Sequence, residues 1–305
     1  MDEQRWRDEG WLAGAHAWIA AEVARLGAQP TGDSEQRHVR LWSTVLRVPT
    51  DQGDLWFKAN DATMLHEGRV VAAVSARCPE LVPPLLAHDE QRGWMLMADA
   101  GEWLRSVAPR EGSLDRWRDV LRRYSAAQIA VTDCVDDLLA AGVPDRRLPT
   151  LAGDYAALMD KIEAGADLRA GVRLVTELVD ELESYGIAET LQHDDLHDGQ
   201  VFVKDGAHLV MDWGDACISH PFFTLSVTLD GVVAWGLDDV AHSVDVQPFQ
   251  DAYLAPFREL YQGDLDAACT TARRLGWACR AVNGHVAGDD AATRSRLAMF
   301  LDGTV

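Results

Sequence analysis

The sequence lacks the features that mark several large protein classes. No apolar run approaches the roughly 18 residues that a membrane-spanning helix needs, so we expect no integral membrane protein. The first residues, MDEQRWRDEGW, do not show the basic-then-apolar order of a secretory signal peptide. The five cysteines include no C-x-x-C pair, which argues against a disulfide framework and a thiolate zinc site. These absences predict a protein of the reducing cytoplasm.

Positive charge is also scarce. Lys and Arg number 28 against 49 Asp and Glu, which gives a formal net charge of −21. A chain this acidic repels nucleic acid and anionic lipid, and no block of clustered Lys or Arg offsets the repulsion. We therefore expect neither nucleic acid nor membrane as a partner. A cationic small molecule is compatible with the charge, although an acidic surface kept for solubility explains it more simply. The sequence leaves the oligomeric state open.

The composition is otherwise that of an ordinary globular chain, with 48% hydrophobic and 25% charged residues. Its 305 residues suit two domains, or one domain with two lobes. Residues 1–99 predict a small unit of strands with a leading helix. The expected helices span 3–26 and 61–77, with a loop at 28–35, and the expected strands lie within 39–48, 55–57, 81–87 and 94–98.

The remainder, residues 100–305, is predicted to be mainly helical. Apolar stripes at spacings of three and four indicate helices within 114–138, 168–185, 222–236, 247–262, 264–282 and 289–301. A small strand-rich unit followed by a larger helical one predicts the α+β class.

One non-helical island, residues 190–216, interrupts the helices and carries the candidate chemistry. Two apolar runs, 201–204 and 207–211, flank Asp205-Gly206, the sequence of a two-residue hairpin turn. Pairing about that turn places Gln200 opposite residue 211, and so close to Asp212, because paired strands lie about 5 Å apart.

Oxygen-bearing side chains collect at the open end of this hairpin. Asp195 and Gln200 precede the first strand, and Asp212 and Asp215 follow the second. Carboxylate and amide oxygens are the ligands that Mg²⁺ prefers. The island therefore predicts a magnesium site at this end of the hairpin.

The string HDDLHDGQVFV…VMDWGDA resembles the catalytic loop and metal-binding triplet of the aminoglycoside phosphotransferase family. That family comprises small-molecule kinases, whose usual form is H-G-D-x-H-x-x-N followed by D-[FW]-[EG]. The resemblance implies a bilobal protein-kinase-like fold, with a small antiparallel-sheet lobe and a larger helical lobe. It also implies ATP and Mg²⁺ as cofactors and a small-molecule hydroxyl group as the phosphate acceptor.

The resemblance assigns roles along the island. Asp195 would orient or deprotonate the acceptor hydroxyl, while Gln200 and Asp212 would bind Mg²⁺. His193 would brace the loop, and His197 would serve either as loop scaffold or as a substrate contact. Asp215 would support the site or face the substrate.

The resemblance also requires a strand lysine and a helix glutamate in the first lobe. Lys58 ends the apolar strand LWFKA, and Glu67 lies on the inward face of its helix, in register with Val70, Val71 and Val74. The pair would hold the α- and β-phosphates of ATP. Main-chain groups near Ala98 and Ala100, between the lobes, would bind adenine.

The sequence departs from the family at three places. No G-x-G-x-x-G precedes Lys58, so Ser43 and Thr44 with main-chain N–H groups would have to meet the phosphates. That absence argues against a protein substrate. Gln200 replaces the usual Asn, and Asp194 replaces the usual Gly.

The resulting hypothesis is ATP-dependent phosphorylation of an alcohol group on an aminoglycoside, amino sugar or related compound. Residues 58, 195, 200 and 212 are expected to gather around one triphosphate. Two alternatives stay open: an ATP-binding protein without turnover, favoured by Gln200 and the missing glycine loop, and a metallohydrolase with His193, Asp194, Asp195 and His197 as ligands.

Overall fold

The computed structural model describes residues 3–303, which form two compact units. The first unit runs to Gly101 and takes in Leu209–Gly214, and the second comprises Glu102–His208 and the chain from Asp215 onward. The division expected from the sequence, 1–99 and 100–305, stays a prediction. The compact units differ from it chiefly in assigning Leu209–Gly214 to the first unit.

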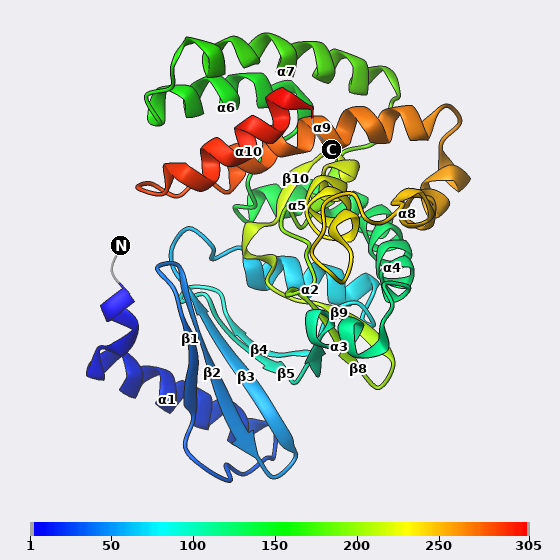
Figure 1. The fold of residues 1–305 in the computed structure, drawn as a ribbon. Helices are drawn as coiled ribbons and strands as arrows, with labels where there is room; N and C mark the ends of the chain where they lie inside the picture. The colour runs from blue at the N-terminus through cyan, green and yellow to red at the C-terminus, as the bar shows by residue number, and fades with distance from the viewer. Residues whose placement is uncertain (1–2, 304–305) are drawn as a thin grey trace. The chain divides into compact units, whose positions relative to one another are not determined.

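A five-stranded antiparallel sheet is the centre of the first unit (Figure 1). In spatial order its strands are β1 (Glu35–Val39), β2 (Ser43–Thr50), β3 (Gly53–Asn60), β5 (Trp94–Ala98) and β4 (Leu85–Asp89). The expected strand at 94–98 is confirmed to the residue. Within 39–48, where the sequence predicts a strand, the structure has the end of β1, a tight turn at 40–42 and most of β2.

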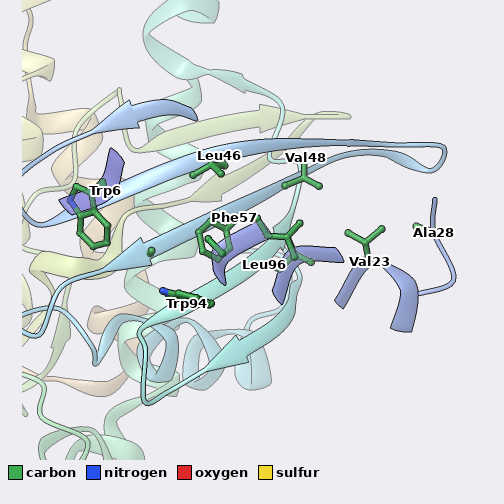
Figure 2. Close-up of a cluster of buried hydrophobic side chains, with 11 residues drawn as sticks. Trp6, Val23, Ala28, Leu46, Val48, Phe57, Trp94 and Leu96 are labelled. Atoms are coloured by element: carbon green, nitrogen blue, oxygen red, sulfur yellow. The ribbon is translucent and has the colours of Figure 1, made fainter. Parts of the chain in front are cut away.

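Helix α1 (Glu9–Arg25) covers one face of this sheet and closes a hydrophobic core (Figure 2). The Asp8 carboxylate accepts a hydrogen bond from the Trp11 N–H at 2.8 Å and so caps the helix, after a separate 3₁₀ turn at Glu3–Arg7. Phe57 packs at the centre, its ring centroid 5.6 Å from that of Trp94. The core fixes β3, which carries Lys58 near its end.

Two elements of the first unit begin later than expected, for local reasons. Helix α2 (Glu67–Arg77) does not start at residue 61, because the Asp61 carboxylate accepts the Thr63 N–H at 2.9 Å and forms a turn there. Strand β4 does not start at residue 81, because Pro83 and Pro84 offer no N–H for the ladder.

The second unit is mainly helical. Its helices are α3 (Leu104–Glu111), α4 (Arg116–Ala130), α5 (Val135–Ala140), α6 (Leu148–Lys161), α7 (Ala166–Ser184), α8 (Gln247–Leu260), α9 (Leu265–Asn283) and α10 (Asp290–Asp302). Short strands accompany them: β6 (Glu102–Trp103), β7 (Thr190–Gln192), β8 (Val201–Lys204), β9 (Ala207–Val210), which continues into the first unit, and β10 (Cys217–Ser219). Across residues 3–303, no helix is long and apolar enough to cross a membrane.

Three expectations for the second unit need correction. The stretch 114–138 is two helices, because the chain leaves α4 at Val131 and forms a 3₁₀ turn at Thr132–Cys134 before α5. Helices α3 and α6 were not predicted. Residues 222–236 do not form one regular helix: a 3₁₀ turn leads into a π turn at Ser226–Asp230, and a separate 3₁₀ turn follows and ends at Gly236, where φ is +67°.

Candidate active site

Lys58 lies in the first unit and contacts two carboxylates there: that of Glu67, its predicted partner, and that of Asp212, the predicted metal ligand. It pairs with Val45 of β2 and Met95 of β5, so its side chain rises from the middle of the sheet. Its Nζ is 2.8 Å from Glu67 and 2.5 Å from the Asp212 Oδ1. A buried amine held by two carboxylates is a fixed cation, suited to a phosphate group.

Glu67 is the first residue of α2 and is 1% exposed. Besides Lys58, it accepts a hydrogen bond of 2.7 Å from the Asn60 side-chain amide. Burial raises the pKa of Glu67, and the Lys58 amine opposes that rise. For Lys58, burial works to lower the pKa, but the carboxylates of Asp212 and Glu67 outweigh it and raise the pKa overall. The charged form of Lys58 is therefore favoured, whereas burial disfavours the charged form of Glu67 and the Lys58 ammonium offsets part of that effect.

The triplet Asp212-Trp213-Gly214 is anchored within the first unit. The Trp213 indole N–H donates to the Val210 carbonyl at 3.1 Å, and the His66 Nε2 lies 3.1 Å from the Gly214 carbonyl. A Cβ at Gly214 would meet the Met64 sulfur at 2.8 Å, so any larger residue there would have to displace the Met64 side chain. Asp212 adopts a left-handed backbone with φ of +63°, and its side chain stays 46% exposed beside Lys58.

The residues proposed for phosphate and adenine are in the first unit but are already engaged in part. Thr44 is fully buried, and its hydroxyl donates to the His38 carbonyl at 2.8 Å. The Ala98 N–H donates to the Pro84 carbonyl at 3.0 Å. Ser43 begins β2, just after the turn, and Ala100 is buried beyond β5. The roles of Ser43, Thr44, Ala98 and Ala100 in nucleotide binding stay predictions.

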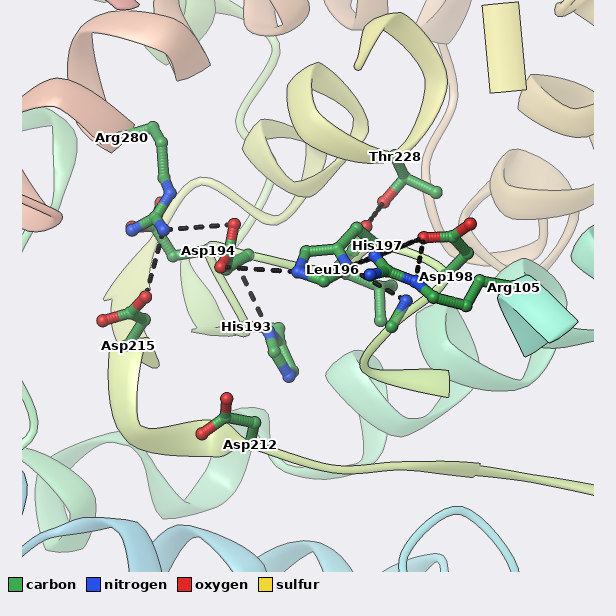
Figure 3. Close-up of polar contacts among 12 residues, drawn as sticks. Arg105, His193, Asp194, Leu196, His197, Asp198, Asp212, Asp215, Thr228 and Arg280 are labelled. Atoms are coloured by element: carbon green, nitrogen blue, oxygen red, sulfur yellow. Dashed lines mark hydrogen bonds and ion pairs between the residues drawn. The ribbon is translucent and has the colours of Figure 1, made fainter. Parts of the chain in front are cut away.

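The loop of the second unit that carries Asp195 is fixed by buried partners. The His193 N–H donates to the Tyr124 hydroxyl at 2.8 Å, and the His193 Nδ1 accepts the Asp195 N–H at 3.4 Å. The Leu196 carbonyl accepts a bond of 2.7 Å from Thr228 in the π turn (Figure 3). His193 therefore lies where a bracing residue is needed.

His197 lies beside the Asp195 carboxylate and holds the following turn. Its Nε2 is 3.8 Å from Asp195 Oδ2, and its Nδ1 accepts the Gly199 N–H at 3.0 Å. Arg105 of α3 pairs with Asp198 at 2.8 Å and closes the same turn. The main-chain N–H of Gln200 donates to the His197 carbonyl at 2.9 Å, so its position follows from the fold of this loop.

Arg280 contacts this loop, although the sequence patterns do not predict it as a site residue. Its buried guanidinium reaches from α9 to Asp194 at 3.1 Å and Asp215 at 3.0 Å (Figure 3). It also lies 3.1 Å from Asp195. The available signal was an arginine on an otherwise apolar helix face, in the string GWACRAV. The Asp215 carboxylate is thus held by a cation within its own unit.

A pocket of about 490 Å³ opens beside Asp195 within the second unit. Trp235, Trp277 and Val232 form apolar parts of its lining, while His197, Arg280 and Arg296 contribute polar atoms. The pocket is thus lined by both polar and apolar groups, and Asp195 is among the residues that line it.

The side chains proposed as metal ligands, one in each unit, carry oxygen donors. Gln200 and Asp212 offer amide and carboxylate oxygens, the hard ligands that Mg²⁺ takes. Within residues 3–303, just one group of three His, Cys, Asp or Glu ligands converges, namely Asp194, Cys217 and Cys279. Asp194 is already paired with Arg280, and the set proposed for a metallohydrolase does not converge.

Comparisons with known proteins agree with this geometry. The chain matches the phosphotransferase enzyme family over residues 27–268. No curated protein is similar enough in sequence to be matched. A macrolide 2′-phosphotransferase type I superposes with a TM-score of 0.61 at 15% identity, covering 93% of this chain and 96% of that one.

Two further solved structures share the fold. A choline/ethanolamine kinase family protein from Mesorhizobium loti gives a TM-score of 0.66 at 16% identity, with 96% and 94% of the two chains covered. The GDP complex of an aminoglycoside 2′-phosphotransferase-IIIa gives 0.61 at 14% identity, with 94% and 97% covered. These likenesses confirm the α+β protein-kinase-like fold. The chain therefore belongs to the phosphotransferase enzyme family, and the predicted kinase activity toward an alcohol group is confirmed at that level.

Proposed function

We propose that the protein is an ATP-dependent O-phosphotransferase that acts on a hydroxyl group of a small molecule. The observation that carries the proposal is the buried contact of Lys58 with both Glu67 and Asp212. A structural ion pair needs one carboxylate, whereas a lysine between two, one of them half-exposed, suits a phosphate-binding role.

Each residue has a distinct task in this proposal. Lys58 holds the ATP phosphates, and Glu67 keeps the Lys58 amine in place. Asp195 orients the acceptor hydroxyl and accepts its proton as the phosphoryl group transfers. Gln200 and Asp212 would hold Mg²⁺, which supplies electrostatic stabilisation of the phosphates when it is bound. Positioning and electrostatics supply the catalysis, with no covalent enzyme intermediate.

The acceptor is proposed to occupy the pocket beside Asp195. Two of its lining arginines, Arg105 and Arg280, are neutralised by carboxylates, whereas the Arg296 side chain donates to the Gly284 carbonyl at 3.0 Å. This lining carries no excess of negative charge, so it gives a polycation no advantage over a neutral alcohol. A useful panel of acceptors therefore spans kanamycin, glucosamine, ethanolamine, erythromycin and glycerate.

The Asp195→Asn variant tests the role of the carboxylate. Removing a positioned base should lower turnover roughly 10²–10⁴-fold while ATP–Mg²⁺ still binds. ADP release against the acceptor panel measures turnover, and the thermal shift with ATP–Mg²⁺ measures binding. If Asp195→Asn keeps the wild-type rate, the assignment of Asp195 is wrong.

A binding protein without catalysis is the second candidate, favoured by Gln200 in place of the usual Asn. The same two assays separate it from the first. Stabilisation of the wild type by ATP–Mg²⁺ without ADP release on any acceptor would favour the binding protein. Restoring Asn by Gln200→Asn would then test whether this one side chain limits turnover.

A further inference from the structure

Arg280 joins two loops whose acidic residues have different tasks. It extends from α9, and its side chain is 6% exposed. One terminal nitrogen, NH1, reaches Asp194, while the other, NH2, reaches Asp195 Oδ1 and Asp215 Oδ2. A single guanidinium thus contacts the proposed base and the acid just after the D-W-G triplet. Arginine suits this task because its planar fork offers several donors at fixed angles.

The carboxylates that bind the Arg280 guanidinium are themselves fixed by hydrogen bonds. Asp194 is buried, and its carboxylate accepts bonds from the side-chain amides of Gln192 at 2.8 Å and Asn283 at 2.9 Å. Asn283, one turn after Arg280 on α9, also donates to the Asp215 carbonyl at 2.7 Å. Arg280 therefore has little freedom to move away from Asp195.

Asp194 occupies this position at a cost in backbone conformation. Its φ of +66° lies in the left-handed region that glycine adopts readily and other residues avoid. Burial raises the pKa of the Asp194 carboxyl, and the Arg280 guanidinium opposes that rise. A buried acid in a disfavoured conformation needs a compensating interaction, and Arg280 provides it.

We propose that Arg280 is a positioning residue, which fixes the Asp195 carboxylate by binding Oδ1 and so directs Oδ2 toward the acceptor hydroxyl. The inference rests on the proposed function, because it assigns Arg280 to the same phosphoryl transfer. The His197 Nε2 lies 3.8 Å from Asp195 Oδ2, the carboxylate oxygen that Arg280 does not contact. Arg280 also supplies the positive charge that lets three carboxylates share one small volume.

The expected pH dependence of activity follows from the charged groups around Asp194, Asp195 and Asp215. Besides the three carboxylates, His197 and Arg296 act on this cluster electrostatically from the loop and from α10. Without Arg280, three neighbouring carboxylates repel one another, and the cluster keeps a proton to higher pH. Since the base must be unprotonated, the acidic limb of the kcat/KM profile should then move to higher pH.

Arg280→Met and Arg280→Lys separate charge from geometry. The Met variant should lower kcat about 10²-fold, leave the KM for ATP unchanged and move the acidic limb upward. The Lys variant keeps the charge without the fork, so it should lower kcat while leaving the limb in place. An Arg280→Met variant with the wild-type limb and kcat would overturn the inference.

Arg273→Met is the matched control. Arg273 lies two turns earlier on α9 and forms a comparably buried ion pair with Asp230 of the π turn. Its loss should lower the melting temperature without moving the acidic limb. If Arg273→Met moves the limb as Arg280→Met does, general destabilisation explains both effects and the inference fails.

Asp215→Asn covers the case in which Arg280→Met does not fold. The Asp215 side chain is 28% exposed, so the substitution is tolerable, and it removes one competitor for the guanidinium. The acidic limb should therefore move to lower pH, opposite to the effect of Arg280→Met. A limb that stays in place or moves upward would contradict the inference.

A double-mutant cycle distinguishes failure of the inference from failure of the proposed function. If Arg280 acts through Asp195, Arg280→Met should have no further effect on the residual rate of Asp195→Asn. Full additivity refutes the inference and leaves the proposed function intact. No ADP release by the wild type on any panel member refutes the proposed function. In that case urea unfolding of the wild type, the two single variants and the double variant tests the inference. Zero coupling between positions 280 and 195 in the free energy of unfolding would contradict it.

Discussion

At the scale of single residues, this protein keeps buried ion pairs whose presence is not explained by stability alone. Burying an ion pair costs desolvation that its attraction barely offsets, so a hydrophobic pair of similar size is often as stable. Lys58 and Glu67 are nonetheless both almost inaccessible to solvent. Arg280 with Asp194 repeats the pattern in the second unit. In the proposed function the first pair would hold a phosphate group, and the second contacts the Asp195 carboxylate through Arg280.

Glu67→Gln tests the first pair at the residue scale. The amide keeps the size of the side chain and a partner for Asn60 but loses the charge that holds Lys58. A hydrogen bond to a charged group contributes about 1.5 kcal/mol, so the KM for ATP should rise roughly tenfold. Steady-state ADP release at varied ATP measures this.

Glu90→Gln is the corresponding control. Glu90 pairs with Arg69 of the same helix at 2.6 Å, but both side chains are more than half exposed. Exposed pairs contribute little, so ATP kinetics should not change. Equal effects of the two substitutions would show that the Lys58–Glu67 contact has no special role.

At the scale of elements, α2 lies close to β4 because Gly68 has no side chain at their contact. A Cβ at Gly68 would lie 2.1 Å from the His88 Nε2, so α2 packs on β4 at a distance that no other residue allows. Glu67 is the neighbouring residue, and its reach to Lys58 depends on that distance. The packing of α2 therefore links a core contact to the phosphate-binding pair.

Gly68→Ala should consequently weaken both stability and ATP binding. Overpacking at such a contact costs about 1–3 kcal/mol, and the displaced helix would carry Glu67 away from Lys58. Gly153→Ala in α6 is the control, because a Cβ there meets nothing within 4 Å and should stabilise the helix by up to ~1 kcal/mol. Urea unfolding and the KM for ATP, measured on both variants, check the prediction. A Gly68→Ala protein as stable as the wild type contradicts it.

The elements also show where local sequence patterns suffice. The hairpin at 201–210 was predictable because Asp205 and Gly206, both with positive φ, form the turn that such pairs favour. The helix expected at 222–236 was wrong, because hydroxyl groups there bond to distant carbonyls. Ser226 donates to Arg273 and Thr228 to Leu196, contacts that periodicity does not encode.

Over the whole molecule, the sequence identifies the family and the motif residues but not the groups that hold them. Lys58, Glu67 and Asp212 were expected together and are in contact. Arg280 lies 85 residues from Asp195 in the sequence, and no spacing rule links them. Tertiary contacts of this kind can be identified only from the folded structure.

The acid sensitivity of the protein should reflect a buried histidine. Burial lowers the pKa of His220 to about 3, from the 6.5 of an exposed histidine. Between these values the unfolded chain binds a proton that the folded chain excludes, so stability falls as the pH drops from 6.5 toward 3. At pH 5 the loss from this residue should be about 2 kcal/mol.

His220→Asn should remove this contribution while retaining a side chain that can cap Phe222. Urea unfolding at pH 7 and pH 5 measures the difference, and the variant should lose less stability on acidification than the wild type. His16→Asn, at an exposed position of α1, should behave as the wild type does. If His220→Asn shows the wild-type pH dependence, His220 is not the origin.

The most direct measurement follows the phosphoryl group itself. Wild-type protein is incubated with ATP labelled on its γ-phosphate, Mg²⁺ and each acceptor of the panel, and the acceptor is then analysed for label. We predict label on the hydroxyl group of at least one acceptor with the wild type, and almost none with Asp195→Asn, although that variant still binds ATP–Mg²⁺. Label transfer that survives Asp195→Asn, or ADP release that never labels an acceptor, would contradict the account.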